Sequence, residues 1–159
     1  MSALDIYIRR QGILVEHLAQ AAAQIPQDKI MWKPCEKALP WLVLIDHTSI
    51  GRREVILKYL LGEKLDLPGC FRDPANQAKT PQEAVSAQRD SWKALKDFLL
   101  SQQGEYEYRK LTPFWGGDEI HIIEFLWLCY EENVHHRGQA WVYARMNGIK
   151  PPAIWGTEA

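Results

Sequence analysis

Apolar side chains recur every three to four residues along four long stretches of the chain, and each stretch ends at a proline or a glycine. This spacing places the apolar groups on one face of a helix, so it predicts amphipathic α-helices. The third has the clearest start, with Thr80 as N-cap, Pro81 in the first turn and Glu83 closing a capping box. The predicted helices cover residues 3–25, 41–61, 81–103 and 118–147. Four such helices bury their apolar faces against one another, which predicts an all-α four-helix bundle.

The connections between the predicted helices are long. Two prolines lie in residues 27–40, and two more with Gly69 lie in residues 62–79, so both segments are predicted to be loops. Either is long enough to cross over the length of the bundle, and the bundle is predicted to contain one long crossover connection. The aromatic, alternating segment 106–115 predicts a short strand pair or an ordered loop, with a turn at 116–118. No repeat or low-complexity tract marks a boundary, so residues 1–159 are predicted to form a single domain.

Charge and composition limit the partners that we expect. The chain has 19 basic and 20 acidic side chains and a formal net charge of −1, whereas nucleic-acid binding needs a basic stripe. The sequence has no apolar run of membrane-spanning length, and its first residues lack the pattern of a signal peptide. Three cysteines without CxxC spacing predict neither a disulfide scaffold nor a zinc knuckle. We therefore expect a cytoplasmic protein without nucleic-acid or membrane partners.

The fourth predicted helix carries polar side chains on its apolar face. At about 100° per residue, Glu132 and His136 fall one turn apart within roughly the same third of the helix circumference. His135 lies about 100° away and is expected to flank that face. The face comprises Ile122, Phe125, Cys129, Glu132, Asn133, His136, Ala140 and Tyr143. The sequence therefore predicts a carboxylate and an imidazole in an otherwise apolar interior.

A third side chain of the ligand type, His47, comes from the second predicted helix. It projects from an apolar stripe that includes Leu44 and Ile50. Burying an imidazole or a carboxylate without a partner is costly. These groups must therefore pair with one another, with polar neighbours such as Gln88 or Asn133, or with a cation.

Two interpretations remain open. Glu132 and His136 can form an ordinary buried hydrogen-bonded pair, or they can bind a metal ion together with His47. Three inward side chains of the ligand type on two helices favour the metal. A di-iron carboxylate site is disfavoured, because Glu132 and His135 supply one ExxH step and the sequence contains no second one.

The end of the chain carries a recognisable motif. HHRGQ at 135–139, followed by YARMNG at 143–148 and by Pro151-Pro152, resembles the closing motif of the DinB-like (DinB/YfiT) family of four-helix bundle metalloproteins. The segment Trp32-Lys33-Pro34 and a single histidine in the second predicted helix occur upstream in the order expected for that family. The resemblance extends over nearly the whole chain.

The resemblance implies a metal site. In the family, one histidine of the second helix and two of the last helix bind one divalent metal. His47 and His136 match two of these ligands, and Glu132 stands where the family usually has the third histidine. The implied set is two histidines and one carboxylate, which suits Zn²⁺, Ni²⁺, Fe²⁺ or Mn²⁺. The departure at Glu132 could equally mark a site that is weakened or lost.

The same resemblance implies a function. Three protein ligands leave coordination positions open for water or substrate, and some relatives use low-molecular-weight thiols. We therefore expect a metal-dependent S-transferase or hydrolase that acts on small molecules. The alternative is a non-catalytic, dimeric binding module of the same fold with a degenerate metal site.

A homodimer is also expected, because the family often dimerises. The last predicted helix has a second apolar face with Trp127, Val134 and Trp141 at seven-residue spacing. Either the rest of the bundle or a second subunit must cover this face.

Overall fold

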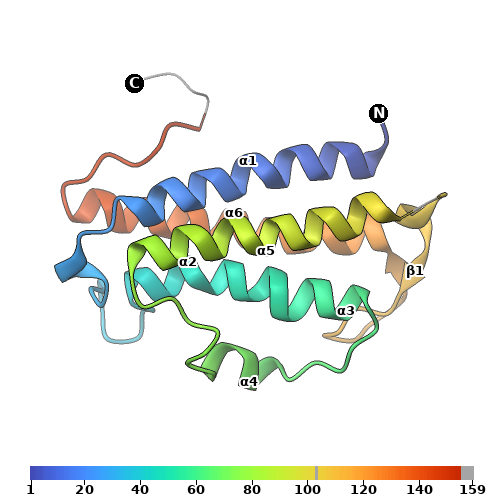
Figure 1. Cartoon of the computed structure of the whole chain (residues 1–159), viewed down its shortest axis with the longest axis horizontal. Helices are drawn as coiled ribbons and strands as arrows, with labels where there is room; N and C mark the ends of the chain where they lie inside the picture. The colour runs from blue at the N-terminus through green and yellow to red at the C-terminus, as the bar shows by residue number, and fades with distance from the viewer. Residues whose placement is uncertain (103, 155–159) are drawn as a thin grey trace.

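The structure, a computed structural model, describes residues 1–102 and 104–154 and contains four long helical segments that lie side by side (Figure 1). α1 spans Ala3–Ala23, α5 spans Pro81–Ser101 and α6 spans Ile122–Met146. The second long segment joins α2 (Trp41–Ile50), a π-helix (Gly51–Leu57) and α3 (Lys58–Leu60). Both α1 and α2 pack against α5 and α6, which confirms the predicted all-α four-helix bundle. None of the described helices is long and apolar enough to cross a membrane.

The chain path contains the predicted crossover. α2 and α5 run in the same direction along the bundle, whereas α1 and α6 run in the opposite direction (Figure 1). The connection between α3 and α5 therefore returns along the outside of the bundle. It contains a short helix, α4 (Leu67–Arg72), where the sequence predicted only a loop. The Asp66 carboxylate caps this helix by accepting a hydrogen bond of 3.0 Å from the Gly69 N–H.

Local chemistry fixes the starts of the long helices. At α1, the Ser2 hydroxyl accepts from the Asp5 N–H (3.1 Å) and the Asp5 carboxylate accepts from the Ser2 N–H (2.8 Å). At α5, the Thr80 hydroxyl accepts from the Glu83 N–H (3.1 Å), as predicted. The Glu83 carboxylate, however, accepts from the N–H of Lys79 (2.7 Å) instead of closing the predicted box on Thr80.

A small antiparallel strand pair lies at one end of the bundle. β1 (Lys110–Leu111) pairs with β2 (Ile120–His121), so the strand pair is the correct one of the two predicted alternatives. Gly116 and Gly117 lie between the strands with φ of +88° and +100°, a backbone conformation that glycine adopts readily. Because β2 uses residues up to His121, α6 begins at Ile122, later than predicted.

The π-helix changes which side chains share a face. His47 and Ile56 line the same cavity although they lie nine residues apart, which on a regular α-helix would place them about 180° from each other. The wider turn of the π-helix, with its i→i+5 hydrogen bonds, brings the two positions closer around the axis. Such turns occur frequently at functional sites. The periodicity of the sequence did not reveal this one.

The interior is apolar toward both ends of the bundle and polar between them. One apolar cluster includes Trp41 and Ala140, and the other includes Leu95 and Phe125. Buried polar side chains of α5, α6 and the π-helix lie between these clusters along the helices. We call this set the polar layer, and it consists of Arg52, Gln88, Ser91 and Asn133.

The second apolar face of α6 is covered within the chain. Trp127 contacts Tyr7 of α1 edge-on, with ring centroids 5.8 Å apart. Trp141 packs against His17 of α1 with centroids 5.9 Å apart. Both tryptophans of this face therefore pack on α1 of the same bundle, while Val134 is half-buried. The homodimer stays a prediction and loses this support.

Candidate metal centre

The structure brings the three predicted ligands together between α2 and α6. One ligand-type atom from each of His47, Glu132 and His136 lies within 4.8 Å of the other two. His136 is buried, with 8% of its surface exposed, as the helical wheel predicted. Glu132 is not the buried carboxylate that the wheel predicted, since 63% of its side chain is exposed. It forms the solvent edge of the site. His135 is exposed and lies outside the group, as expected for a flanking residue.

His136 is held by contacts at both ring nitrogens. Nδ1 lies 2.9 Å from Oε1 of Gln139, and Nε2 lies 2.9 Å from Oε1 of Glu132. In the tautomer that donates to the Gln139 amide oxygen, Nδ1 carries the proton. In a neutral ring, Nε2 then turns its lone pair toward the Glu132 carboxylate. These two groups repel each other unless a proton or a cation lies between them.

His47 is positioned by aromatic contacts. Its ring stacks on Phe71 of α4 at 4.3 Å and meets the His136 ring edge-on at 4.9 Å. Among the described residues, no hydrogen-bond partner occupies its nitrogens. Burial is the main cause that lowers the pKa of His47, the neighbouring His136 adds to it, and Glu132 opposes it. The lowered pKa favours the neutral imidazole, which is the form that binds metals.

The donor set fits a divalent ion in chemistry and spacing. Two imidazoles and one carboxylate are ligands for Zn²⁺ and for the other divalent metals named above. Such ligands lie about 2.0–2.2 Å from the ion, so two donor atoms on a tetrahedral ion are about 3.3–3.6 Å apart. The Glu132–His136 pair, at 2.9 Å, is closer than that, and the whole group lies within 4.8 Å, so the side chains adjust when one ion binds.

A cavity of about 390 Å³ adjoins the three ligands. It lies between α2, the π-helix, α4, α6 and the segment that joins the two strands. Its wall is mostly apolar. The apolar lining consists of Val55, Ile56, Leu67, Phe71, Phe114, Trp115 and Leu128. Phe71, Phe114 and Trp115 come from the connections, so helical periodicity could not place them beside the ligands.

Cys129 also lines the cavity, one turn before Asn133 on α6. Burial, and to a smaller extent the charge of Glu132, raises the pKa of its thiol to about 12. The thiol is therefore protonated at neutral pH and is a poor nucleophile. This cysteine forms part of the wall.

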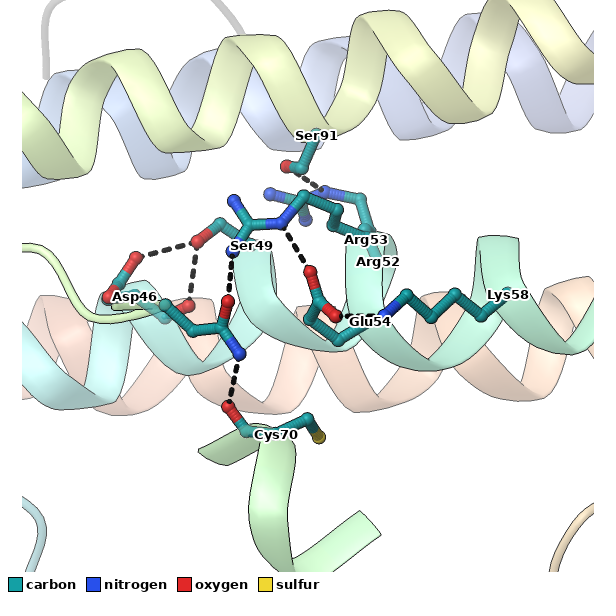
Figure 2. Close-up of polar contacts among 9 residues, drawn as sticks. Asp46, Ser49, Arg52, Arg53, Glu54, Lys58, Cys70 and Ser91 are labelled. Carbon is teal, nitrogen blue, oxygen red and sulfur yellow. Dashed lines mark hydrogen bonds and ion pairs between the residues drawn. The ribbon is translucent and has the colours of Figure 1, made fainter. Parts of the chain in front are cut away.

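The polar layer lies behind the ligands. Arg52 has no exposed surface and donates to Asn133 Oδ1 (3.0 Å), to Ser91 Oγ (3.3 Å) and to Gln88 Oε1. Figure 2 shows its contact with Ser91, the Asp46–Ser49 pair and the ion pairs of Glu54. Burial lowers the pKa of Arg52 to about 10, so the guanidinium stays charged at neutral pH. Sequence reasoning noted Gln88 and Asn133 but missed the arginine that joins them.

A scan against protein-family models matched the DinB family over residues 53–158, which is more than half of the chain. The chain belongs to the DinB family. The match confirms the resemblance seen in the closing motif, and it includes Glu132 and His136. The matched region begins after His47. The assignment of His47 to the site therefore rests on its position beside Glu132 and His136 in the structure. A search of the curated proteins found no match.

Proposed function

We propose that this DinB-family protein binds one divalent metal ion through His47, Glu132 and His136 and acts on small molecules that enter the adjoining cavity. The observation that carries the proposal is the contact of 2.9 Å between His136 Nε2 and Glu132 Oε1. In the tautomer whose Nδ1 donates to Gln139, the Nε2 lone pair faces the Glu132 carboxylate, an arrangement that a shared cation stabilises. His47 lies on the same side with no hydrogen-bond partner among the described residues, so its nitrogen is available to the same ion.

The side chains of the site support a metal-dependent S-transferase or hydrolase. A divalent ion bound there would polarise a carbonyl group or lower the pKa of a water molecule or thiol. Gln139 orients the His136 ring, and stacking on Phe71 orients His47. The buried Cys129 does not supply a nucleophile at neutral pH. The reacting water or low-molecular-weight thiol therefore comes from solvent, and the exposed Glu132 marks the side on which it approaches.

The contact between His136 and Glu132 also supports a second candidate function, that of a binding module without a metal. If the shared cation is a proton, His136 and Glu132 form an imidazolium–carboxylate pair that needs no metal. The protein would then be a non-catalytic binding module of the family, working as a dimer with a degenerate metal site. The two proposals differ in metal content.

Metal content per chain separates them. Untagged protein is reconstituted with Zn²⁺, Ni²⁺, Fe²⁺ or Mn²⁺, freed of excess metal and measured by mass spectrometry. We expect about one ion per chain in the wild type, and its loss in His47→Ala and His136→Ala without unfolding by circular dichroism. His135→Ala is the matched control, because this exposed histidine lies outside the group, and it should keep the ion. No bound metal in the wild type would favour the binding module.

A pair of assays separates transfer from hydrolysis. The loaded protein is given an aromatic halide with cysteine as the thiol, and in parallel an aromatic ester without thiol. A transferase consumes thiol and halide together, whereas a hydrolase releases acid from the ester alone. Either rate should fall to the uncatalysed level in His136→Ala. Rates that do not depend on His136 would contradict an enzymatic role for the site.

A further inference from the structure

Apart from the three ligands and the indole N–H of Trp115, the polar side chains of the cavity wall have little to offer a bound molecule. Thr48 donates to the Ile45 carbonyl (2.8 Å) and accepts from the Gln88 amide (2.9 Å). Asn133 accepts from Arg52 (3.0 Å) and donates to the Cys129 carbonyl (2.7 Å). Their hydrogen bonds are directed into the protein. A sugar or peptide group in the cavity would lose its water without gaining partners, which is unfavourable.

The wall also lacks side chains that would balance a second charge. Among the described residues that line the cavity there is no lysine or arginine, and Glu132 is the single carboxylate. The guanidinium of Arg52 lies behind Asn133 with its donors directed to protein oxygens. A phosphate or a second carboxylate on the ligand would therefore be buried without a counter-charge. The three ligands are the one place where a charged head can bind.

The apolar part of the wall presents flat aromatic surfaces. Phe71 stacks on His47 at 4.3 Å, directly beside the ligands. Trp115 stacks on Phe125 at 5.6 Å, and Phe114 meets the Trp115 ring edge-on at 4.7 Å. The volume of about 390 Å³ is at the low end of the range for small-molecule sites, roughly 300–1,000 Å³. A cavity of about 150 Å³ holds one benzene ring, so this space suits a body of one to about two aromatic rings.

From this arrangement we infer that the cavity selects small apolar ligands, preferably aromatic, that carry a single polar head. The head binds at His47, Glu132 and His136, and the body lies against Phe71 and Trp115. The position of the head rests on the metal site proposed above. The position of the body rests on the cavity alone. Sugars, nucleotides, peptides and molecules with a charge at each end should bind in this cavity much more weakly.

Gly51 offers a way to fill the cavity. It lines the wall in a helical conformation (φ −55°, ψ −42°), and a Cβ added there would meet no heavy atom within 4 Å. Gly51→Leu should therefore place its side chain in part of the cavity, from a Cβ that meets no clash. Gly138 is the matched control, because it is an exposed helical glycine whose added Cβ would also meet nothing within 4 Å. Gly138→Leu leaves the cavity open.

The head and the body are tested together on the zinc-loaded protein. Benzohydroxamate and acetohydroxamate share a metal-binding head and differ in the aromatic ring, and calorimetry gives their dissociation constants. We expect benzohydroxamate to bind about 10- to 100-fold more tightly, because its ring is buried. A carboxylate added at the para position should remove that advantage. Gly51→Leu should also remove it, whereas Gly138→Leu should keep it. Equal affinity of the two probes would overturn the inference.

The body is also tested without metal. Toluene, which has no head, is titrated into metal-free protein and observed by ligand-detected NMR. Binding to the wild type and to Gly138→Leu, with loss in Gly51→Leu, supports the apolar selectivity even if no metal binds. Toluene binding that Gly51→Leu does not change, or no binding at all, overturns it. Metal content is measured on the same samples, so a failure of the metal site is read separately from a failure of the cavity.

Discussion

The polar layer and the three candidate ligands are neighbouring groups of polar side chains that differ in how they are satisfied. The layer is closed, since Arg52 donates to three neutral side-chain oxygens and Asn133 is bonded on both sides. The ligand group is open. Among the described residues His47 makes only ring contacts with its side chain, and His136 meets the mostly exposed carboxylate of Glu132. The two regions meet on α6, where Asn133 of the polar layer directly follows Glu132 of the ligand group.

The contrast shows that polarity inside a bundle does not by itself identify a site. A buried polar group that is fully bonded specifies the packing of the helices around it. A group with lone pairs left over, beside a cavity and at the edge of solvent, is available to a ligand. Breaking the first kind should affect stability, and breaking the second should affect binding. The following predictions test this division, from the largest expected effect to the smallest.

Removal of Arg52 should have the largest effect. Arg52→Ala leaves a hole and exposes three acceptors that have lost their donor, so the free energy of unfolding should fall by about 3–5 kcal/mol. His47→Ala in metal-free protein should cost less than about 1 kcal/mol, because His47 makes no hydrogen bond to the described residues. Urea unfolding measures both. Arg52→Met, which keeps most of the volume, separates the hole from the lost hydrogen bonds. Equal losses at Arg52 and His47 would remove the distinction between the two regions.

Substitution of Glu132 should change metal affinity and leave stability nearly unchanged. Glu132→Gln removes an anionic ligand, so the dissociation constant for Zn²⁺ should rise by more than the roughly 10- to 100-fold that loss of an outer partner costs. Glu132→His introduces the ligand type that the family resemblance leads us to expect at this position, and it should keep one ion per chain. Competition with a chelator measures the affinity. If Glu132→Gln binds zinc as tightly as the wild type, the carboxylate is not a ligand.

The helices were predictable because their signals are local. Thr80, Pro81 and Gly104 mark the ends of one helix within the sequence that surrounds it. The π-helix at Gly51–Leu57 was missed, because it alters the turn without a distinctive composition. The short helix α4 was missed because its six residues contain Pro68 and Gly69, which also occur in loops.

The candidate site was predictable only in part, for a related reason. A helical wheel gives the direction of His136 and Glu132 from the axis but not what covers that direction. The wheel therefore placed Glu132 in the core, whereas the structure leaves it at the edge of the cavity. Phe71 and Trp115 reach the site through the path of the crossover and of the strand pair. That path depends on packing between distant segments, which periodicity does not encode.

The stability of the two regions should also respond differently to pH. Burial lowers the pKa of His47 in the folded chain below its usual value near 6.5. A lowered pKa contributes stability that is fully present above pH 6.5 and is lost as the pH falls below it. Metal-free wild type should therefore lose stability between pH 7 and 5 more steeply than His47→Gln. The polar layer does not titrate in this window, since the pKa of Arg52 is about 10.

His17 provides a matched comparison for that measurement. Burial and the charge of Arg137 lower the pKa of His17 as well, but His17 lies on α1, outside the ligand group. Like His47→Gln, His17→Gln should reduce the loss of stability on acidification. Saturation with Zn²⁺ should change only the contribution of His47 to that loss, because His17 does not contact the ion. Urea unfolding at pH 7, 6 and 5 measures both. An unchanged pH slope in His47→Gln would contradict the buried, neutral state of this ring.

The smallest expected effect concerns Cys129, which lies where the two regions meet. Its carbonyl accepts from Asn133 of the polar layer, and its thiol lines the cavity beside the ligands. Because its pKa is raised to about 12, iodoacetamide at pH 8 should label the exposed Cys35 rapidly and Cys129 only on unfolding. Mass spectrometry of the labelled peptides, with Cys35→Ser and Cys70→Ser as background, measures this. Rapid labelling of Cys129 in folded protein would instead reveal a thiolate in the cavity wall. The protein would then supply its own nucleophile, and the site would not need a thiol from solvent.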